Sequence, residues 1–145
     1  MKKNIALNNL DERIRFFPFG LGKTEGTVKF VFNPVNTGAS HLNMERMKNN
    51  GIREKIKIKA LDAIYKDFNL STEDRIFMKI DVEGMEIDLI QGAHEFLSEF
   101  PNLLIIIEKK HADPDLVMKE MNSIGTFKYQ SIDKFNMAIK KIKSN

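Results

Sequence analysis

The feature that most constrains the fold of this 145-residue chain lies between residues 75 and 107, where two apolar segments flank an amphipathic one. Residues 75–80 are mostly apolar, and residues 103–107 are five consecutive aliphatics, which is typical of a strand buried on both faces. Residues 85–100 repeat apolar side chains at three- and four-residue steps up to Pro101, which indicates one continuous helix. This order predicts a parallel βαβ unit with a right-handed crossover.

Shorter elements are expected on both sides of this unit. Upstream, the patterns predict a short helical piece at 2–10, a strand at 14–19 and a short helix at 61–68. They also predict a strand at 27–32 that pairs with one at 54–60. Residues 33–40 are predicted to be a loop, and 41–50 are ambiguous. Downstream we expect a helix at 115–123 and a closing antiparallel pair at 127–132 and 136–142. The chain therefore reads as one α/β domain over residues 1–145.

Composition excludes several classes of protein. The chain has no Cys, so it has neither disulfides nor thiolate metal sites. Its net charge is +3, and 20 acidic residues are interspersed among 23 basic ones, which favours a solvated surface over a nucleic-acid interface. No signal peptide is visible, and the longest apolar run is far too short to span a bilayer. We therefore expect a cytoplasmic protein with no nucleic-acid partner and no membrane span.

Polar side chains that could carry chemistry follow the two predicted parallel strands. Asp81 and Glu83 come directly after the first strand, Glu108 ends the second, and His111 follows in a loop. Ligands of open parallel sheets bind beyond the carboxyl ends of the strands. The pattern therefore predicts that three carboxylates and a histidine converge on one ligand crevice.

Structural explanations stand beside this functional one. Asp81 could cap the following helix, Glu83 could complement the helix dipole, and Gly84 could simply permit a tight turn. The same carboxylates with His111 could also hold a divalent metal ion. Their spacing is not diagnostic of a metal site, so we expect none.

Several spaced motifs together resemble the FkbM family of S-adenosylmethionine-dependent methyltransferases. They are the run Phe-Met-Lys-Ile-Asp-Val-Glu-Gly-Met-Glu at 77–86, Leu-Ile-Gln-Gly-Ala at 89–93, and Ile-Glu at 107–108. Weaker matches are Asn-Asn at 8–9, Phe-Gly-Leu-Gly at 19–22 with Gly26, Asn-Thr-Gly-Ala-Ser at 36–40, and Ala-Leu-Asp at 60–62. The resemblance covers nearly the whole chain.

The resemblance implies a Rossmann-like class I methyltransferase sheet, S-adenosylmethionine as cofactor, and a hydroxyl acceptor on a sugar, glycolipid or polyketide-like molecule. It places Asp81 beside the methionine end of the cofactor and beside the acceptor, with Gly84 also at the cofactor. Asp81 and Glu83 would be the catalytic residues, Glu83 orienting the acceptor or taking its proton. Lys79, Glu108 and His111 would bind the acceptor.

The family's glycine-rich cofactor loop and its first two strands should precede Lys2. The glycines at 20, 22 and 26 are not that loop, because an alternating β-type run follows them where a cofactor loop would open a helix. We therefore expect a domain truncated at its N-terminal side, with the strand at 75–80 as an exposed apolar edge. Such an edge predicts self-association or pairing with a missing N-terminal half. An inactive, partner-binding fragment is the alternative function.

Overall fold

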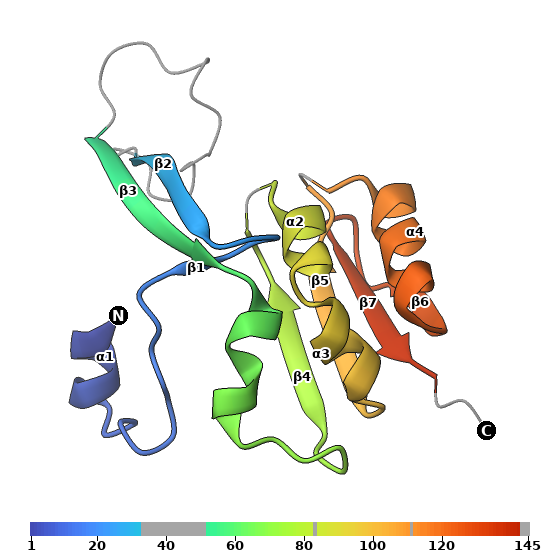
Figure 1. Cartoon of the computed structure of the whole chain (residues 1–145), viewed down its shortest axis with the longest axis horizontal. Coiled ribbons are helices and arrows are strands. Elements are labelled where there is room, and N and C mark those ends of the chain that lie inside the picture. The colour runs from blue at the N-terminus through green and yellow to red at the C-terminus, as the bar shows by residue number, and fades with distance from the viewer. Residues whose placement is uncertain (33–51, 83, 111, 143–145) are drawn as a thin grey trace.

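The computed structural model of this chain describes residues 1–32, 52–82, 84–110 and 112–142. Within them the chain is a mixed α/β structure with two sheets (Figure 1). The predicted loop at 33–40 and the ambiguous segment at 41–50 lie outside the described residues.

The larger sheet has four strands in the order β4-β5-β7-β6. They are β4 (Ile76–Ile80), β5 (Leu103–Glu108), β6 (Phe127–Ser131) and β7 (Asn136–Lys141). The predicted parallel pairing of β4 with β5 is confirmed, and so is the closing antiparallel pair of β6 and β7. Within the described chain β4 is an edge strand, as the sequence predicts.

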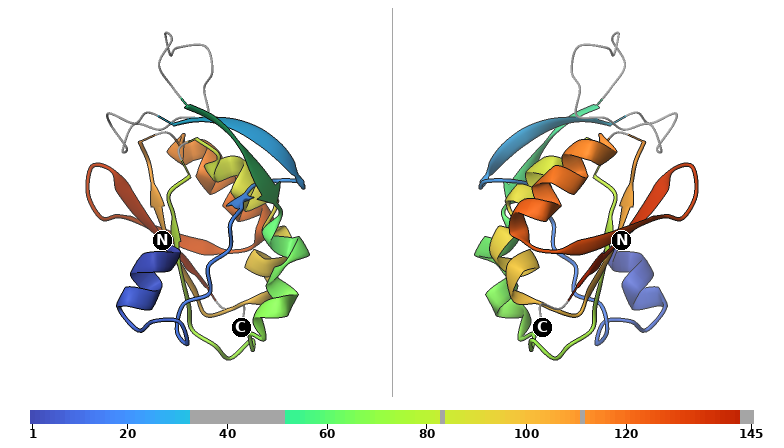
Figure 2. Two further views of the ribbon diagram at one scale, coloured as in Figure 1. Left: turned by 90° about the vertical axis from the view of Figure 1, so that its left-hand side faces the viewer. Right: turned by 90° about the vertical axis from the view of Figure 1, so that its right-hand side faces the viewer.

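Three helices cover one side of this sheet: α2 (Glu86–Gln91), α3 (His94–Glu99) and α4 (Pro114–Ile124). Figure 2 shows the sheet nearly edge-on with these helices on the same side. The core lies between the two layers, where Ile105, Leu97 and Val117 are almost completely buried. Asp113 caps α4 by accepting from the amides of two residues in its first turn, so the predicted helix at 115–123 is confirmed and starts slightly earlier.

The prediction of one continuous helix over 85–100 is wrong, because the helix breaks at Gly92. A Cβ on Gly92 would meet the carbonyl oxygen of Gly22, with the carbonyl carbon of Gly22 at 2.9 Å and the Cα of Lys23 at 3.0 Å. The backbone of the turn at 22–23, which connects two strands of the smaller sheet, therefore packs directly onto the α2–α3 junction. Beyond the break, Asp62 accepts hydrogen bonds from the amides of Glu95 and Phe96, both at 2.9 Å. A residue remote in sequence thus caps the new helix start.

The smaller sheet has the order β1-β3-β2, from β1 (Gly20–Leu21), β2 (Gly26–Phe32) and β3 (Ile52–Lys59). The predicted antiparallel pairing of β2 with β3 is confirmed. Two short 3₁₀ helices, η2 (Leu61–Ala63) and η3 (Tyr65–Phe68), occupy the segment predicted as one short helix. At the N-terminus α1 (Lys2–Leu7) matches the predicted helical piece.

The predicted strand at 14–19 is wrong, since only Gly20 and Leu21 pair with β3. Pro18 has no amide to donate, and the neighbouring side chains pack by aromatic contact. The ring of Phe17 lies 5.5 Å from the ring of Phe19 and 5.5 Å from that of Phe68. Aromatic packing thus holds this segment in place of the strand pairing that the sequence predicts.

The expectation that β5 is buried on both faces is also wrong. Its side chains alternate, with Leu103, Ile105 and Ile107 buried while Leu104 is 39% exposed. None of the described helices is long and apolar enough to cross a membrane.

Replacing Gly92 with Ala should destabilise the protein by about 1–3 kcal/mol, because the added methyl must displace backbone rather than a flexible side chain. Gly26→Ala is the matched control, since a Cβ there meets nothing within 4 Å. Urea unfolding of both variants would measure the difference. Equal stabilities of the two variants would contradict the close backbone contact.

Asp62→Ala should cost about 0.5–2 kcal/mol, because it leaves two amides of α3 without their acceptor. Asp62→Asn keeps an acceptor oxygen and should retain most of the stability. Thermal unfolding and amide exchange at Glu95 and Phe96 would report the cap. If Asn is as damaging as Ala, the cap depends on charge rather than on the hydrogen bonds.

Candidate functional site

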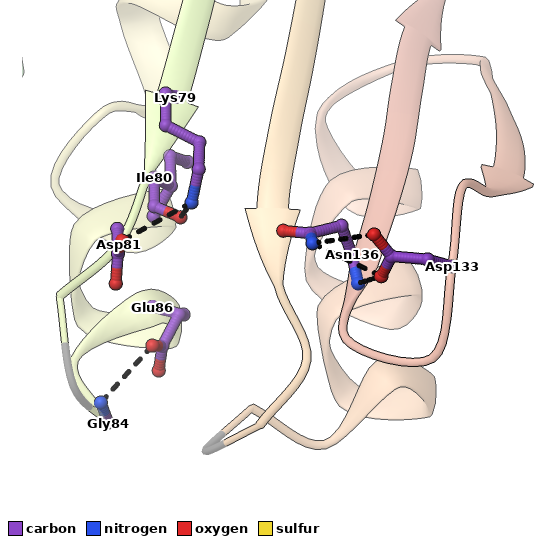
Figure 3. A network of polar contacts seen from close by, with 7 residues as sticks. All are labelled: Lys79, Ile80, Asp81, Gly84, Glu86, Asp133 and Asn136. Carbon is purple, nitrogen blue, oxygen red and sulfur yellow. Dashed lines mark hydrogen bonds and ion pairs between the residues drawn. The ribbon is translucent and has the colours of Figure 1, made fainter.

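The candidate site lies at the carboxyl edge of the larger sheet. Ile80 and Ile107 are register partners in the parallel ladder of β4 and β5, so Asp81 and Glu108, the next residue of each, lie at adjacent strand ends. Figure 3 shows Asp81, Gly84 and Glu86 beyond β4, with Asn136 and Asp133 nearby at the hairpin of β6 and β7. Two of the predicted carboxylates therefore lie at one edge, as the sequence predicts.

Asp81 points an exposed carboxylate away from the strand end. Its Oδ2 lies 3.4 Å from the Nζ of Lys79, which also lies 3.5 Å from the carbonyl oxygen of Ile80. Both side chains are about half exposed, 43% for Lys79 and 53% for Asp81, so this pair contributes no more than about 1 kcal/mol. A partner that binds this weakly leaves the carboxylate of Asp81 accessible to a ligand.

The explanation of Asp81 as a helix cap is wrong. The helix α2 begins at Glu86, with Met85 at its N-cap position and no side-chain cap. The carboxylate that organises this turn is instead that of Glu86, whose Oε1 accepts from the amide of Gly84 at 3.1 Å. Gly84 has φ +97°, a backbone conformation that favours glycine.

Glu86 is a residue that sequence reasoning missed. It is 3% exposed, and among the described residues it is the single buried charged side chain. A buried carboxylate is costly unless it is hydrogen-bonded, and the contact with Gly84 supplies one such bond. Its signal in the sequence was weak, since it stands two residues after a glycine at the start of an amphipathic helix. Glu86 therefore positions the loop that carries Asp81.

Glu108 lies against the β6–β7 hairpin, where it is the register partner of Asn136. The Oδ1 of Asp133 accepts from the amides of Phe135 and Asn136, both at 2.7 Å, and the side-chain amide of Asn136 donates to the same carboxylate. The Asn136 contact, with the two amides, lowers the pKa of Asp133. Lys109 adds hydrogen bonds to the hydroxyl of Ser131 and the carbonyl of Asp133. These hydrogen bonds hold the turn of the β6–β7 hairpin in place next to Glu108.

Two predicted site residues, Glu83 and His111, lie outside the described residues. Among those the structure does describe, no group of three or more acidic or histidine side chains is placed to hold a metal ion. The metal hypothesis therefore gains no support from this part of the chain.

The glycines at 20 and 22 have structural roles. A Cβ on either would come within 2.8 Å of the side chain of Ile58, so these glycines allow β1 and the following turn to approach β3. The turn leads into β2 and opens no helix, as the sequence predicts. Their close approach to Ile58 accounts for both glycines without a bound phosphate or nucleotide.

Glu86→Ala should destabilise the protein by about 1–3 kcal/mol, because it leaves the Gly84 amide without its acceptor and empties a buried position. Glu86→Gln keeps an oxygen at the same place and should retain most of the stability. Thermal unfolding, together with amide exchange at Gly84, would distinguish the Ala variant from the Gln variant. Faster exchange at Gly84 in the Gln variant than in the Ala variant would contradict this role.

A family model of the methyltransferase FkbM domain matches residues 1–129. This range includes the glycine contacts that join the sheets, the Asp62 cap, and the edge that carries Asp81 and Glu108. No curated protein and no solved structure matches the chain. The matched range is most of the chain, and it confirms the resemblance drawn from residues 77–86, 89–93 and 107–108: the protein belongs to the FkbM methyltransferase family.

Proposed function

We propose that this protein is an S-adenosylmethionine-dependent methyltransferase that methylates a hydroxyl of a sugar, glycolipid or polyketide-like acceptor, on a Rossmann-like class I scaffold. The observation that carries the proposal is the exposed carboxylate of Asp81 beside the end of β5, in a chain matched by the FkbM family model. Carboxyl edges of parallel strands are where ligands of such sheets bind.

S-adenosylmethionine supplies a methyl group on a positively charged sulfonium. Asp81 offers a carboxylate whose one polar contact among the described residues is with Lys79. A carboxylate at that position favours a cationic donor, and it can accept a proton from an acceptor hydroxyl within hydrogen-bond reach. The proposed catalytic pair is Asp81 with Glu83. Gly84 has no side chain, so the backbone of the loop could approach the cofactor closely there.

Acceptor binding is proposed for Lys79, Glu108 and His111. Lys79 presents an ammonium next to Asp81. Glu108 lies at the neighbouring strand end, on β5, where it pairs with Asn136 of the β6–β7 hairpin. Carboxylate and ammonium groups at these positions suit an acceptor rich in hydroxyls, since each hydroxyl both donates and accepts. Positioning the acceptor oxygen in line with the methyl and its leaving group supplies a large part of such catalysis.

The alternative is a catalytically inactive domain that serves as a partner-binding half. The open edge of β4 favours it, because the described chain offers this strand no neighbour on that side. Titrating the protein with S-adenosylmethionine by calorimetry, followed by methyl transfer from labelled cofactor to hydroxyl acceptors, separates the two. Saturable binding with transfer supports the methyltransferase, whereas absence of both favours the inactive alternative.

Asp81→Asn should lower kcat by about 10²–10⁴-fold if the carboxylate takes the acceptor proton. Asp88→Asn is the matched control, because Asp88 is an exposed carboxylate on α2 and no site role is assigned to it. Initial rates at saturating acceptor, with thermal unfolding as the check on folding, give the comparison. Equal rates for the two variants would exclude Asp81 as the base.

A further inference from the structure

The turn that joins β6 to β7 carries two large apolar side chains beside the candidate site. It runs over residues 132–135, and its first and last residues, Ile132 and Phe135, are 51% and 49% exposed. Turns are usually built from Gly, Pro, Asn, Asp and Ser, so the backbone of this turn does not require Ile and Phe. Single exposed apolar side chains are common on proteins. Two at one turn that adjoins a ligand edge indicate a contact surface instead.

Backbone pairing places this turn next to Glu108. Glu108 of β5 is the register partner of Asn136, and the carbonyl of Phe135 accepts from the amide of Lys109 at 2.6 Å. Figure 3 shows Asn136 and Asp81 at the same edge of the sheet. Neighbouring strands lie about 4.8 Å apart, so β7 is about 10 Å from β4. A ligand of that length reaches from Asp81, past Glu108, to the turn.

The polar groups of the turn are engaged with one another. The carboxylate of Asp133 accepts from the backbone amides of Phe135 and Asn136 and from the side-chain amide of Asn136. The Nζ of Lys109 donates to the hydroxyl of Ser131 and to the carbonyl of Asp133, and that hydroxyl donates to the same carbonyl. A surface held in one shape loses little entropy when it binds a ligand. The turn therefore offers a ligand mainly its apolar side chains.

The place of the turn in the sheet and in the chain supports a role in specificity. The strands that it joins, β7 and β6, are the two furthest from β4, so a neighbour of β4 would lie at the opposite side of the sheet. The turn also follows residue 129, where the match to the family model ends. Loops vary among related proteins and often carry binding residues.

The ring of Phe135 remains available to a ligand. Its cationic neighbour is Lys134, whose ammonium lies 5.5 Å from the ring centroid. A contact of this kind between exposed side chains is weak, so a ligand that packs on the ring displaces it at little cost.

We propose that Ile132 and Phe135 form an apolar subsite for the acceptor, which joins a hydroxyl-rich part to an alkyl chain. The hydroxyl-rich part lies at Asp81 and Glu108, and the alkyl chain packs on the turn. Burial of the chain favours such an acceptor over the same sugar without it. This inference rests on the proposed function and narrows its acceptors to those that carry an apolar chain.

Hexyl glucoside and methyl glucoside test the subsite in the whole chain, because they present the same sugar hydroxyls. An NMR titration of isotope-labelled protein should give hexyl glucoside a Kd at least about tenfold lower, since its additional methylenes leave water. The largest shift changes should be at the amides of Ile132 and Phe135. Hexanol, which has the chain without the sugar, should bind at least about tenfold more weakly than hexyl glucoside.

Variants locate the binding. Phe135→Ala and Ile132→Ser should each lower the preference for hexyl over methyl glucoside by about threefold or more, with the affinity for methyl glucoside unchanged. Leu70→Ser is the matched control, because Leu70 is 38% exposed and precedes β4 at the amino end of that strand. It should leave the preference unchanged. Thermal unfolding checks each variant, and either turn variant decides the test if the other fails to fold.

Three results would overturn the subsite. They are equal affinities for the two glucosides, an equal loss of preference in the Leu70 variant, and shift changes confined to Phe77 and Leu104. The last result would place the chain on the open face of the sheet, opposite α2, α3 and α4.

Methyl transfer from labelled S-adenosylmethionine distinguishes a failure of the subsite from a failure of the proposed function. Transfer to both glucosides with equal kcat/KM keeps the proposed function and removes the subsite. Selective binding of hexyl glucoside at the turn, without transfer to either glucoside, supports the subsite and counts against methyl transfer.

Discussion

The parallel pairing of β4 with β5 is the constraint on which the rest of this structure depends. Its register brings Ile80 beside Ile107, so Asp81 and Glu108 emerge at adjacent strand ends. The same register assigns alternate residues to opposite faces, which places Ile105 in the core and Leu104 on the open face. The position of the candidate site and the alternation of buried and exposed side chains along β5 thus both follow from the pairing of β4 with β5.

A second constraint joins the two sheets. Gly22 and Gly92 approach so closely that neither position has room for a side chain without movement, and Asp62 caps the helix that starts after the break. These residues belong to motifs by which the chain resembles its family, yet their roles here are structural. A family motif therefore contains both residues that hold the scaffold and residues that face a ligand.

The short loop after β4 shows this division most clearly. Glu86 is buried and accepts from the Gly84 amide, whereas Asp81 is exposed and contacts only Lys79 among the described residues. Two carboxylates five positions apart thus differ in burial and in partner. Burial makes the first an internal brace, because its charge cannot reach a ligand without breaking the turn, while exposure leaves the second available for chemistry.

Local periodicity was enough to predict β2, β3, β4, β5 and the closing hairpin, the parallel βαβ unit, and the family, because each rests on neighbours in sequence or on short spaced motifs. Tertiary contacts decided the rest. The helix over 85–100 breaks because a distant glycine packs against it, and residues 14–19 pack through aromatic rings. Leu104 is exposed because α2, α3 and α4 all lie on the other side of the sheet. Glu86 shows the same limit, since the sequence pattern carries no sign that this carboxylate is buried in the folded chain. A sequence pattern predicts on which face of a strand or helix a side chain lies. Whether that face is buried depends on which other elements pack against it, and this is decided only in the tertiary structure.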